Sequence, residues 1–345
     1  MGEILALGIT HYPPLCGTDE NMAWILRKML ENPNLPDKCR TPEGWPEPMR
    51  AEWGDDEGLA SAKRHRSDLV GWLDKSRAAL DDFKPDFVLI WGDDQYENFQ
   101  EDLIPPWSIA AHDDFSFNPP PNNVWREPTD MAFGLSGARR AGKHLATELI
   151  KLGLETSYSY KPLHHPLGHA FSNGVMFLDY HRRGFPYPIL PFAINCYGRH
   201  VIAQHGGLPD FSRKLADEDL DPPAPTPRRL FELGAATARI LAQSQYRVAL
   251  LASSGWSHAF LTPKNFGLWP DLPADRGCYE AIARGDYKAF AELSPIAIEE
   301  SGQQEILNWV CLAGALHELG RKPRTTGLVD TWIFNSSKCF LIAPP

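Results

Sequence analysis

Histidine, carboxylate and amide side chains follow three separate apolar segments of this sequence. Imidazole and carboxylate groups bind transition metals and transfer protons near neutral pH. If the segments are parallel strands, their carboxyl ends meet at one edge of a sheet, where open α/β proteins bind ligands. The pattern therefore predicts a metal or acid–base site built from distant parts of the chain. The groups are His11 after residues 4–9, Asp93-Asp94-Gln95 after residues 87–91, and His258 after residues 248–252.

A fourth group of polar residues, His164, His165 and His169, precedes a predicted helix. One histidine in such a place is more often a structural hydrogen-bonding group than a ligand. The acidic residues after the segment 87–91 are, taken alone, equally compatible with a turn that binds nothing. The convergence of several strand ends is what favours a functional site.

The segments that position these residues alternate between short apolar runs and helical patterns, which predicts a largely parallel sheet with helices on both faces. We therefore expect a single α/β domain over residues 1–345. Its last strand-like run, with Asn335-Ser336-Ser337 at the centre, favours a hairpin or an edge strand. The expected strands are 4–9, 87–91, 156–160, 188–195, 248–252 and 331–342, and the expected helices are 60–80, 136–152, 171–182, 227–242 and 302–319.

Two segments, 32–56 and 113–130, are rich in proline and other residues that interrupt regular structure. Long loops inside a compact domain are usually functional. We expect both segments to form lids or walls of the active site.

The composition indicates an ordinary globular protein, with 43% hydrophobic and 23% charged residues. A formal net charge of −10 argues against binding to nucleic acid or to an anionic membrane. No apolar run reaches the length of a membrane span, and the first residues lack the basic start of a signal peptide. Six scattered cysteines without a CxxC pair indicate reduced thiols, so the expected location is the cytoplasm.

Four motifs resemble the class III extradiol ring-cleavage dioxygenases, the superfamily of the protocatechuate 4,5-dioxygenase catalytic subunit. Each motif alone is weak, but together they follow the family's order over nearly the whole chain. The Gly-Asp-Asp-Gln sequence and the long segment before it look closest to the 3-O-methylgallate dioxygenase branch. The motifs are Ile9-Thr-His-Tyr-Pro-Pro-Leu15, Asp93-Asp-Gln-Tyr-Glu-Asn-Phe99, Ser254-Gly-Trp-Ser-His-Ala-Phe-Leu261 and Glu300-Ser-Gly-Gln-Gln-Glu-Ile-Leu-Asn-Trp309.

The resemblance implies a non-haem Fe(II) enzyme that uses O2 to cleave the ring of a catecholic aromatic acid, of the protocatechuate, gallate or 3-O-methylgallate type. It also implies a homo-oligomer, which we expect to be a dimer. Two histidines and one carboxylate would hold the iron and leave positions for substrate and O2. By resemblance His11 is the first ligand, Glu305 is the carboxylate, His258 is the acid–base residue, and His169 contacts the substrate hydroxyl or an intermediate.

The second histidine ligand of the family lies in an Asn-Asp-His motif, and this chain has Gln95 at the histidine position. Gln95 would be a weaker ligand through its amide oxygen. We expect His65 to replace it, from the N-terminal end of the helix that leads to the strand 87–91. Asp94 would then orient a ligating histidine, or else cap a turn. In a third alternative, the site has lost its metal.

Candidate substrate-binding residues are Tyr12, Gln95, Tyr197 and Arg199. Arginine suits a benzoate carboxylate because its guanidinium pairs with both oxygens. Arg199 is equally compatible with a surface position or an intersubunit ion pair. Two other functions fit the same residues: a metal-dependent hydrolase, and a metal-free binding protein with the same fold.

Overall fold

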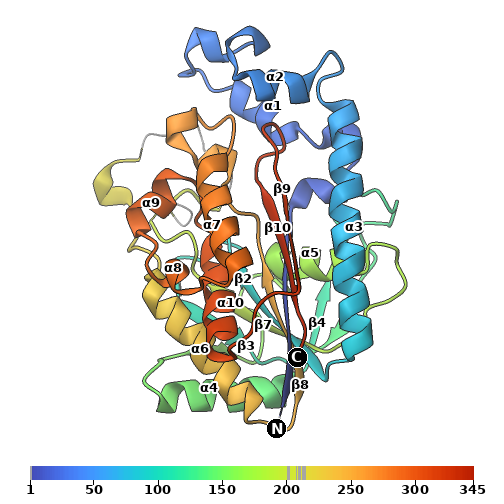
Figure 1. Cartoon of the computed structure of the whole chain (residues 1–345), viewed down its shortest axis with the longest axis vertical. Helices are drawn as coiled ribbons and strands as arrows, with labels where there is room; N and C mark the ends of the chain where they lie inside the picture. The colour runs from blue at the N-terminus through green and yellow to red at the C-terminus, as the bar shows by residue number, and fades with distance from the viewer. Residues whose placement is uncertain (1, 200–202, 207, 209–210, 212–214) are drawn as a thin grey trace.

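An eight-stranded sheet runs through the centre of the molecule in the computed structural model (Figure 1). The structure describes residues 2–199, 203–206, 208, 211 and 215–345. The strand order is β6-β3-β7-β2-β8-β1-β10-β9. The strands of this sheet are β1 (Glu3–Ile9), β2 (Phe87–Asp93), β3 (Trp107–Ala110), β6 (Ser157–Ser159), β7 (Ile189–Ile194), β8 (Arg247–Ser253), β9 (Thr325–Val329) and β10 (Lys338–Ala343).

The four central strands, β7, β2, β8 and β1, are parallel to one another. Towards one edge, β10 is antiparallel to β1 and β9 is antiparallel to β10. Towards the other edge, β3 is antiparallel to β7 and parallel to β6. The prediction of a mostly parallel sheet flanked by helices is confirmed.

Both faces of the central strands are buried, as is usual in parallel sheets. Along β2 the side chains of Phe87, Leu89 and Trp91 point into one hydrophobic cluster, and those of Val88 and Ile90 point into the other. This alternation explains why the strand reads as an uninterrupted apolar run in the sequence.

Helices cover both faces of the sheet (Figure 1). On one face, α3 (Leu59–Phe83) packs against β1 and β10, and α5 (His169–Leu178) packs against β2 and β8. On the other face, α10 (Ile306–Glu318) packs against β8, β2 and α6 (Pro227–Ala242), while α4 (Arg139–Lys151) packs against β3. The expected helices in these five regions are therefore present.

Other predictions were wrong in part. The run 331–342 is not one strand: residues 330–337 form a loop, in which Asn335 has a φ of 64°. β10 forms an antiparallel hairpin with the preceding strand β9, as one of the two alternatives had it, whereas β10 itself lies inside the sheet and not at its edge. The segment 32–56 is not a continuous loop, because it contains α2 (Glu47–Trp53). The segment 113–130 contains β4 (Asp114–Phe117), which pairs with β5 (Phe133–Ser136).

Helix α7 (Leu272–Arg284) was not predicted. Proline and glycine within it obscured its amphipathic pattern, although proline is favourable in the first turn of a helix.

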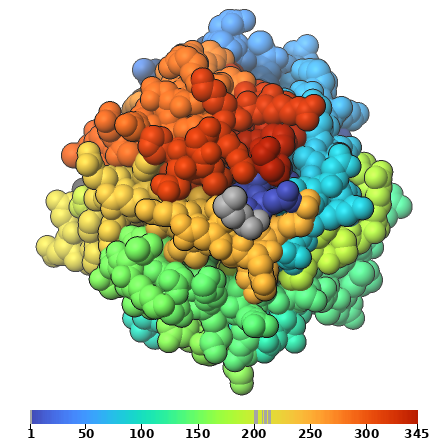
Figure 2. Space-filling model, turned by 60° about the horizontal axis from the view of Figure 1, so that its bottom comes forward, coloured from blue at the N-terminus to red at the C-terminus, as the bar shows by residue number. Residues whose placement is uncertain are grey.

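The carboxyl ends of the four central strands all point to the end of the molecule where α1 (Trp24–Leu30) and α2 lie, at the top of Figure 1. The opposite end is covered by α4 and α6 around the N-terminus (Figure 2). Any site formed by residues that follow these strands therefore lies beneath α1 and the segments near it.

Within the described ranges, we find no helix with the length and apolar character needed to cross a membrane. All six cysteines are free and buried, which agrees with the expected reduced thiols.

Candidate active site

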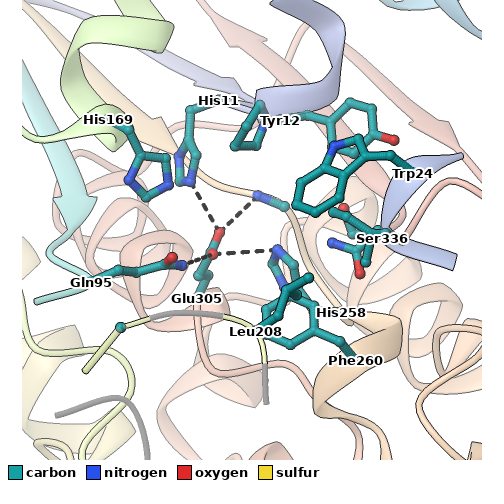
Figure 3. A pocket seen from close by; sticks show the side chains of 15 residues that line it. His11, Tyr12, Trp24, Gln95, His169, Leu208, His258, Phe260, Glu305 and Ser336 are labelled. Atoms are coloured by element: carbon teal, nitrogen blue, oxygen red, sulfur yellow. Dashed lines mark hydrogen bonds and ion pairs between the residues drawn. The ribbon is translucent and has the colours of Figure 1, made fainter. Parts of the chain in front are cut away.

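A cavity of about 220 Å³ lies at the carboxyl ends of the central strands (Figure 3). It is smaller than the roughly 300–1,000 Å³ of pockets for drug-sized ligands, so it suits a small molecule. All four sequence motifs contribute to its lining. The lining residues from the motifs are His11, Tyr12, Pro13, Gln95, Gly255, His258, Phe260 and Glu305, and those from outside the motifs are Trp24, Ile25, His169, Gly206, Leu208, Asn335 and Ser336.

His11 follows β1 and is almost completely buried. Its Nδ1 lies 2.9 Å from the carbonyl oxygen of Ser253, at the end of the neighbouring strand β8. The Nδ1–H therefore donates to this carbonyl, and Nε2 is left with its lone pair facing the cavity. Burial lowers the pKa of His11 well below its usual value, which keeps the ring neutral.

Glu305 immediately precedes α10 and is 1% exposed. The backbone N–H of Gly255 donates to one carboxylate oxygen at 3.1 Å, and the hydroxyl of Tyr197 and the amide of Gln95 donate to the other. The oxygen that accepts from Gly255 lies 3.5 Å from His11 Nε2 (Figure 3). Burial, together with the nearby Asp93, raises the pKa of Glu305 well above its usual value.

The position of Glu305 depends on the packing of the helix that follows it. Trp309, one turn into α10, is fully buried against Gly8 of β1. A β-carbon at Gly8 would lie 2.1 Å from the Trp309 ring, so only glycine permits this contact. Glu305 is therefore not on a solvated helical surface.

His258 follows β8, and its Nε2 lies 3.3 Å from Glu305. Its backbone N–H donates to the carbonyl oxygen of Gly302 at 2.8 Å. Gly302 has a φ of 68°, and a β-carbon there would lie 2.6 Å from the His258 carbonyl, so this turn requires glycine. Burial lowers the pKa of His258 to about 3, which keeps the imidazole neutral at neutral pH.

His169 is the first residue of α5, and its ring lies edge-on to that of His11, with 5.0 Å between the ring centres. Its Nδ1 lies 2.9 Å from the carboxylate of Glu97, which also accepts the His169 backbone N–H. Burial opposes protonation of this ring, but Glu97, Asp93 and Glu305 raise its pKa to about 10.

Asp93, the last residue of β2, is fully buried and lies 3.8 Å from His11 Nε2. One of its carboxylate oxygens accepts from Asn308, and the other has no hydrogen-bonding partner among the described residues. Burial raises its pKa to about 7. Ligand atoms of His11, Asp93 and His169 all lie within 4.8 Å of one another, a set of nitrogen and oxygen donors that fits a divalent first-row metal.

Two predicted substrate-binding residues, Tyr12 and Gln95, line the cavity. Tyr197 lies behind Glu305 and donates to it. Arg199 is half-buried and is not among the residues that line the cavity; its carbonyl accepts from the backbone of Asp221. The structure therefore brings Tyr12 and Gln95 to the cavity, but neither Tyr197 nor Arg199.

His65 lies outside the cavity, so the structure does not support the expected replacement of Gln95 by His65. α3 begins at Leu59, which places His65 in the second turn and not at the N-terminus. The ring packs against Tyr12 and Phe334.

Of the two alternatives for Asp94, the structure shows the turn cap. Its side chain accepts the backbone N–H groups of Glu97, Asn98 and Phe99. Glu97 is the carboxylate that contacts a site histidine. Of the other two histidines in the fourth group, His164 pairs with Asp102 on the surface, and neither His164 nor His165 lines the cavity.

Several site residues had not been predicted. Asp93 and Glu97 both belong to a motif that was recognised, but the sequence does not show which of its polar residues turn inwards. Trp24, Phe260, Asn335 and Ser336 form the outer wall. The last two reach the cavity because the loop before β10 pairs with the segment after β8, through the bridge between His258 and Ser336.

The chain is similar to curated proteins named 2,3-dihydroxyphenylpropionate/2,3-dihydroxicinnamic acid 1,2-dioxygenase. That of Photorhabdus laumondii subsp. laumondii is 26% identical over 183 residues, which cover 52% of this chain and 45% of the relative. That of Pseudomonas putida, which carries the further number 2 in its name, is 26% identical over 188 residues, 53% of this chain and 46% of the relative. That of Azotobacter vinelandii is 25% identical over 226 residues, which cover 63% of this chain and 56% of the relative.

The chain thus spans about half the length of the curated relatives it matches. No family model matches it. The relatives agree with a resemblance to dioxygenases of dihydroxylated aromatic compounds, whereas the 3-O-methylgallate branch is not confirmed.

Proposed function

We propose that this protein is a non-haem Fe(II) extradiol dioxygenase that cleaves the ring of a catecholic compound with O2. The observation that carries the proposal is the arrangement of His11, His258 and Glu305. Both imidazole Nε2 atoms lie within 3.5 Å of the Glu305 carboxylate, at the base of a cavity for a small molecule.

His11 and Glu305 would hold the ion. Both are fixed before any ion binds, His11 by the carbonyl of Ser253 and Glu305 by the N–H of Gly255. Such outer hydrogen bonds hold ligands in the geometry that a metal requires. When bound, Fe(II) supplies the coordination positions for a catechol and for O2.

His258 would act as the general base. Its Nε2 faces the cavity beside Glu305, and its neutral state at neutral pH allows it to take the proton of a substrate hydroxyl. A positioned base of this kind contributes roughly 10²–10⁴-fold to a rate.

The walls suit a flat aromatic ring. Trp24 and Phe260 lie at the outer part of the cavity, opposite the polar base formed by Gln95, His11 and Glu305 (Figure 3). The substrate class we propose is a substituted catechol, with the protocatechuate, gallate and 3-O-methylgallate types and the dihydroxyphenylpropionate type of the relatives as candidates.

The test is an oxygen-electrode assay of protein loaded anaerobically with Fe(II). The substrates are catechol, protocatechuate, gallate, 3-O-methylgallate and 2,3-dihydroxyphenylpropionate. We expect O2 uptake with at least one of them, together with the absorbance of a ring-opened product. A protein that retains iron but consumes no O2 with any of the five, and hydrolyses an ester instead, would favour a hydrolase.

A further inference from the structure

Gln95 leaves open which residue supplies the second nitrogen ligand of the proposed iron site. The structure contains three candidates: Gln95 itself, the buried His65 and the half-buried His169. They differ in the direction in which a lone pair points and in the charges around them.

We propose that His169 is the second imidazole ligand and that Glu97 is the residue that positions it. This inference rests on the proposed iron site and names a member of it. The Nδ1–H of His169 donates to Glu97 at 2.9 Å, so the proton that a metal ion would displace is the one on Nε2. The ring faces His11 across 5.0 Å (Figure 3).

His11 and His169 are held by the same kind of hydrogen bond. His11 donates from Nδ1 to a carbonyl of the sheet, and His169 donates from Nδ1 to a carboxylate. In both rings a fixed acceptor holds the proton on Nδ1, so Nε2 is the atom available to a metal ion, which is the usual arrangement around a ligating histidine. Their ligand atoms and that of Asp93 lie within 4.8 Å of one another.

Glu97 is itself well anchored. It accepts the backbone N–H of His169 at the N-terminus of α5, where the helix dipole favours a negative charge. Gly168, the residue before the helix, permits this approach, because a β-carbon there would lie 2.9 Å from a Glu97 oxygen. The carboxylate and the helix together fix the imidazole from two sides.

The alternative ligands are occupied or remote. The Gln95 amide nitrogen faces Glu305 at 3.3 Å and also contacts Tyr197, so Gln95 acts as a donor to the metal-binding carboxylate. His65 does not line the cavity, and a buried lysine, Lys338, repels positive charge near its ring. Gln95 therefore replaces the family's histidine without replacing its function.

The experiment compares His169→Ala with His65→Ala, a matched removal of a buried histidine. Each protein is loaded anaerobically with Fe(II) and desalted, and its iron is measured by mass spectrometry. The nitrosyl–iron complex is then studied by pulsed EPR, which counts imidazole nitrogens bound to the metal. Circular dichroism and thermal unfolding establish that each variant is folded.

For His169→Ala we expect iron affinity to fall at least about 100-fold, and the retained iron to show one imidazole in place of two. Glu97→Gln should lower iron affinity about 10–100-fold, because this substitution weakens only the positioning of the His169 ring. His65→Ala should keep both the iron and two imidazoles. A double variant carries both His169→Ala and Gln95→His. The new imidazole at position 95 lies beside Glu305 and should restore a site with two imidazole ligands.

Retention of iron with two imidazoles in His169→Ala would overturn the inference, as would loss of iron in His65→Ala alone. If the unsubstituted protein binds iron through two imidazoles that include His169 but consumes no O2 with any catechol, the proposed activity fails and this inference stands. If it retains no iron at all, both are overturned.

Discussion

His169 and His65 lie on the same face of the sheet, and burial penalises a charge on either ring, yet their surroundings are opposite. His169 is next to Glu97 and near Asp93 and Glu305. His65 lies between aromatic rings, with Lys338 and Arg66 nearby. In the first region carboxylates lie next to a ring that lines the cavity, whereas in the second region the charged groups nearest the ring are cationic and the ring does not line the cavity.

This difference explains why one region suits a divalent cation and the other does not. Carboxylates attract a cation, and their attraction is strongest away from water. In the second region, Lys338 has its ammonium over the Tyr12 ring at 3.6 Å and donates to the carbonyl of Phe334. Lys338 and Arg66 offer no ligand atom to a cation, and His65 does not line the cavity. The second region therefore supports the cavity wall from behind.

The largest expected effect comes from the buried carboxylates of the two regions. Glu305→Gln should lower iron affinity at least about 100-fold and abolish O2 uptake, because a ligand with a negative charge is lost. Glu52→Gln is the matched control. Glu52 is largely buried near Lys338 and accepts from Thr331, so its loss should leave iron content unchanged and reduce only stability. Iron analysis and urea unfolding measure the two outcomes; iron loss in both variants would remove the distinction.

The next effect concerns the base. His258→Ala should lower kcat by roughly 10²–10⁴-fold while iron content stays the same, because His258 moves a proton and does not bind the metal. His164→Ala, which removes a surface histidine paired with Asp102, is the control. A loss of iron in His258→Ala, measured in the same samples as kcat, would assign His258 to the ligands instead.

A smaller effect separates two buried tyrosines. The Tyr197 hydroxyl donates to Glu305, whereas that of Tyr12 donates to the carbonyl of Met22 at 3.2 Å. Tyr197→Phe should weaken iron binding about 10-fold by removing a donor to a ligand. Tyr12→Phe should not change iron affinity. Equal Fe(II) dissociation constants for the two variants would contradict the role given to Tyr197.

The smallest effect is the opposite pH dependence of the two histidines in metal-free protein. The pKa of His169 is raised to about 10, so its contribution to stability is full below about pH 6.5 and is lost as the pH rises towards 10. The pKa of His65 is lowered, chiefly by burial, so its contribution is full above about pH 6.5 and is lost as the pH falls.

Glutamine at either position removes the titration. Relative to the unsubstituted protein, His169→Gln should show a flatter decline in the urea midpoint above pH 6.5, and His65→Gln a flatter decline below it. Parallel pH profiles for the two variants would show that the two regions do not differ in charge.

The fold was largely predictable because its central strands are buried on both faces and therefore appear as apolar runs. The strand at residues 87–91 and the helix at 227–242 are found almost as expected. The antiparallel edge of the sheet and the loop before β10 could not be predicted, because strand order and pairing depend on contacts between residues distant in the sequence.

In the site, His11, His169, His258 and Glu305 were predicted from motifs, and the structure brings all four to one cavity. The role of Glu97 was not predictable, because it depends on a contact with a histidine 72 residues away. The sequence around His65 already argued against a metal ligand there. His65 lies within Lys63-Arg64-His65-Arg66, and positively charged neighbours disfavour a bound cation.

The most direct test of this account is the position of the metal itself. Crystals soaked anaerobically with Fe(II) would be measured with X-rays at the iron absorption edge, and the anomalous difference map would locate the ion. We predict one peak at bonding distance from His11 Nε2, His169 Nε2 and Glu305. A peak bound by Gln95 or His65 in place of His169, or no peak in this cavity, would contradict it.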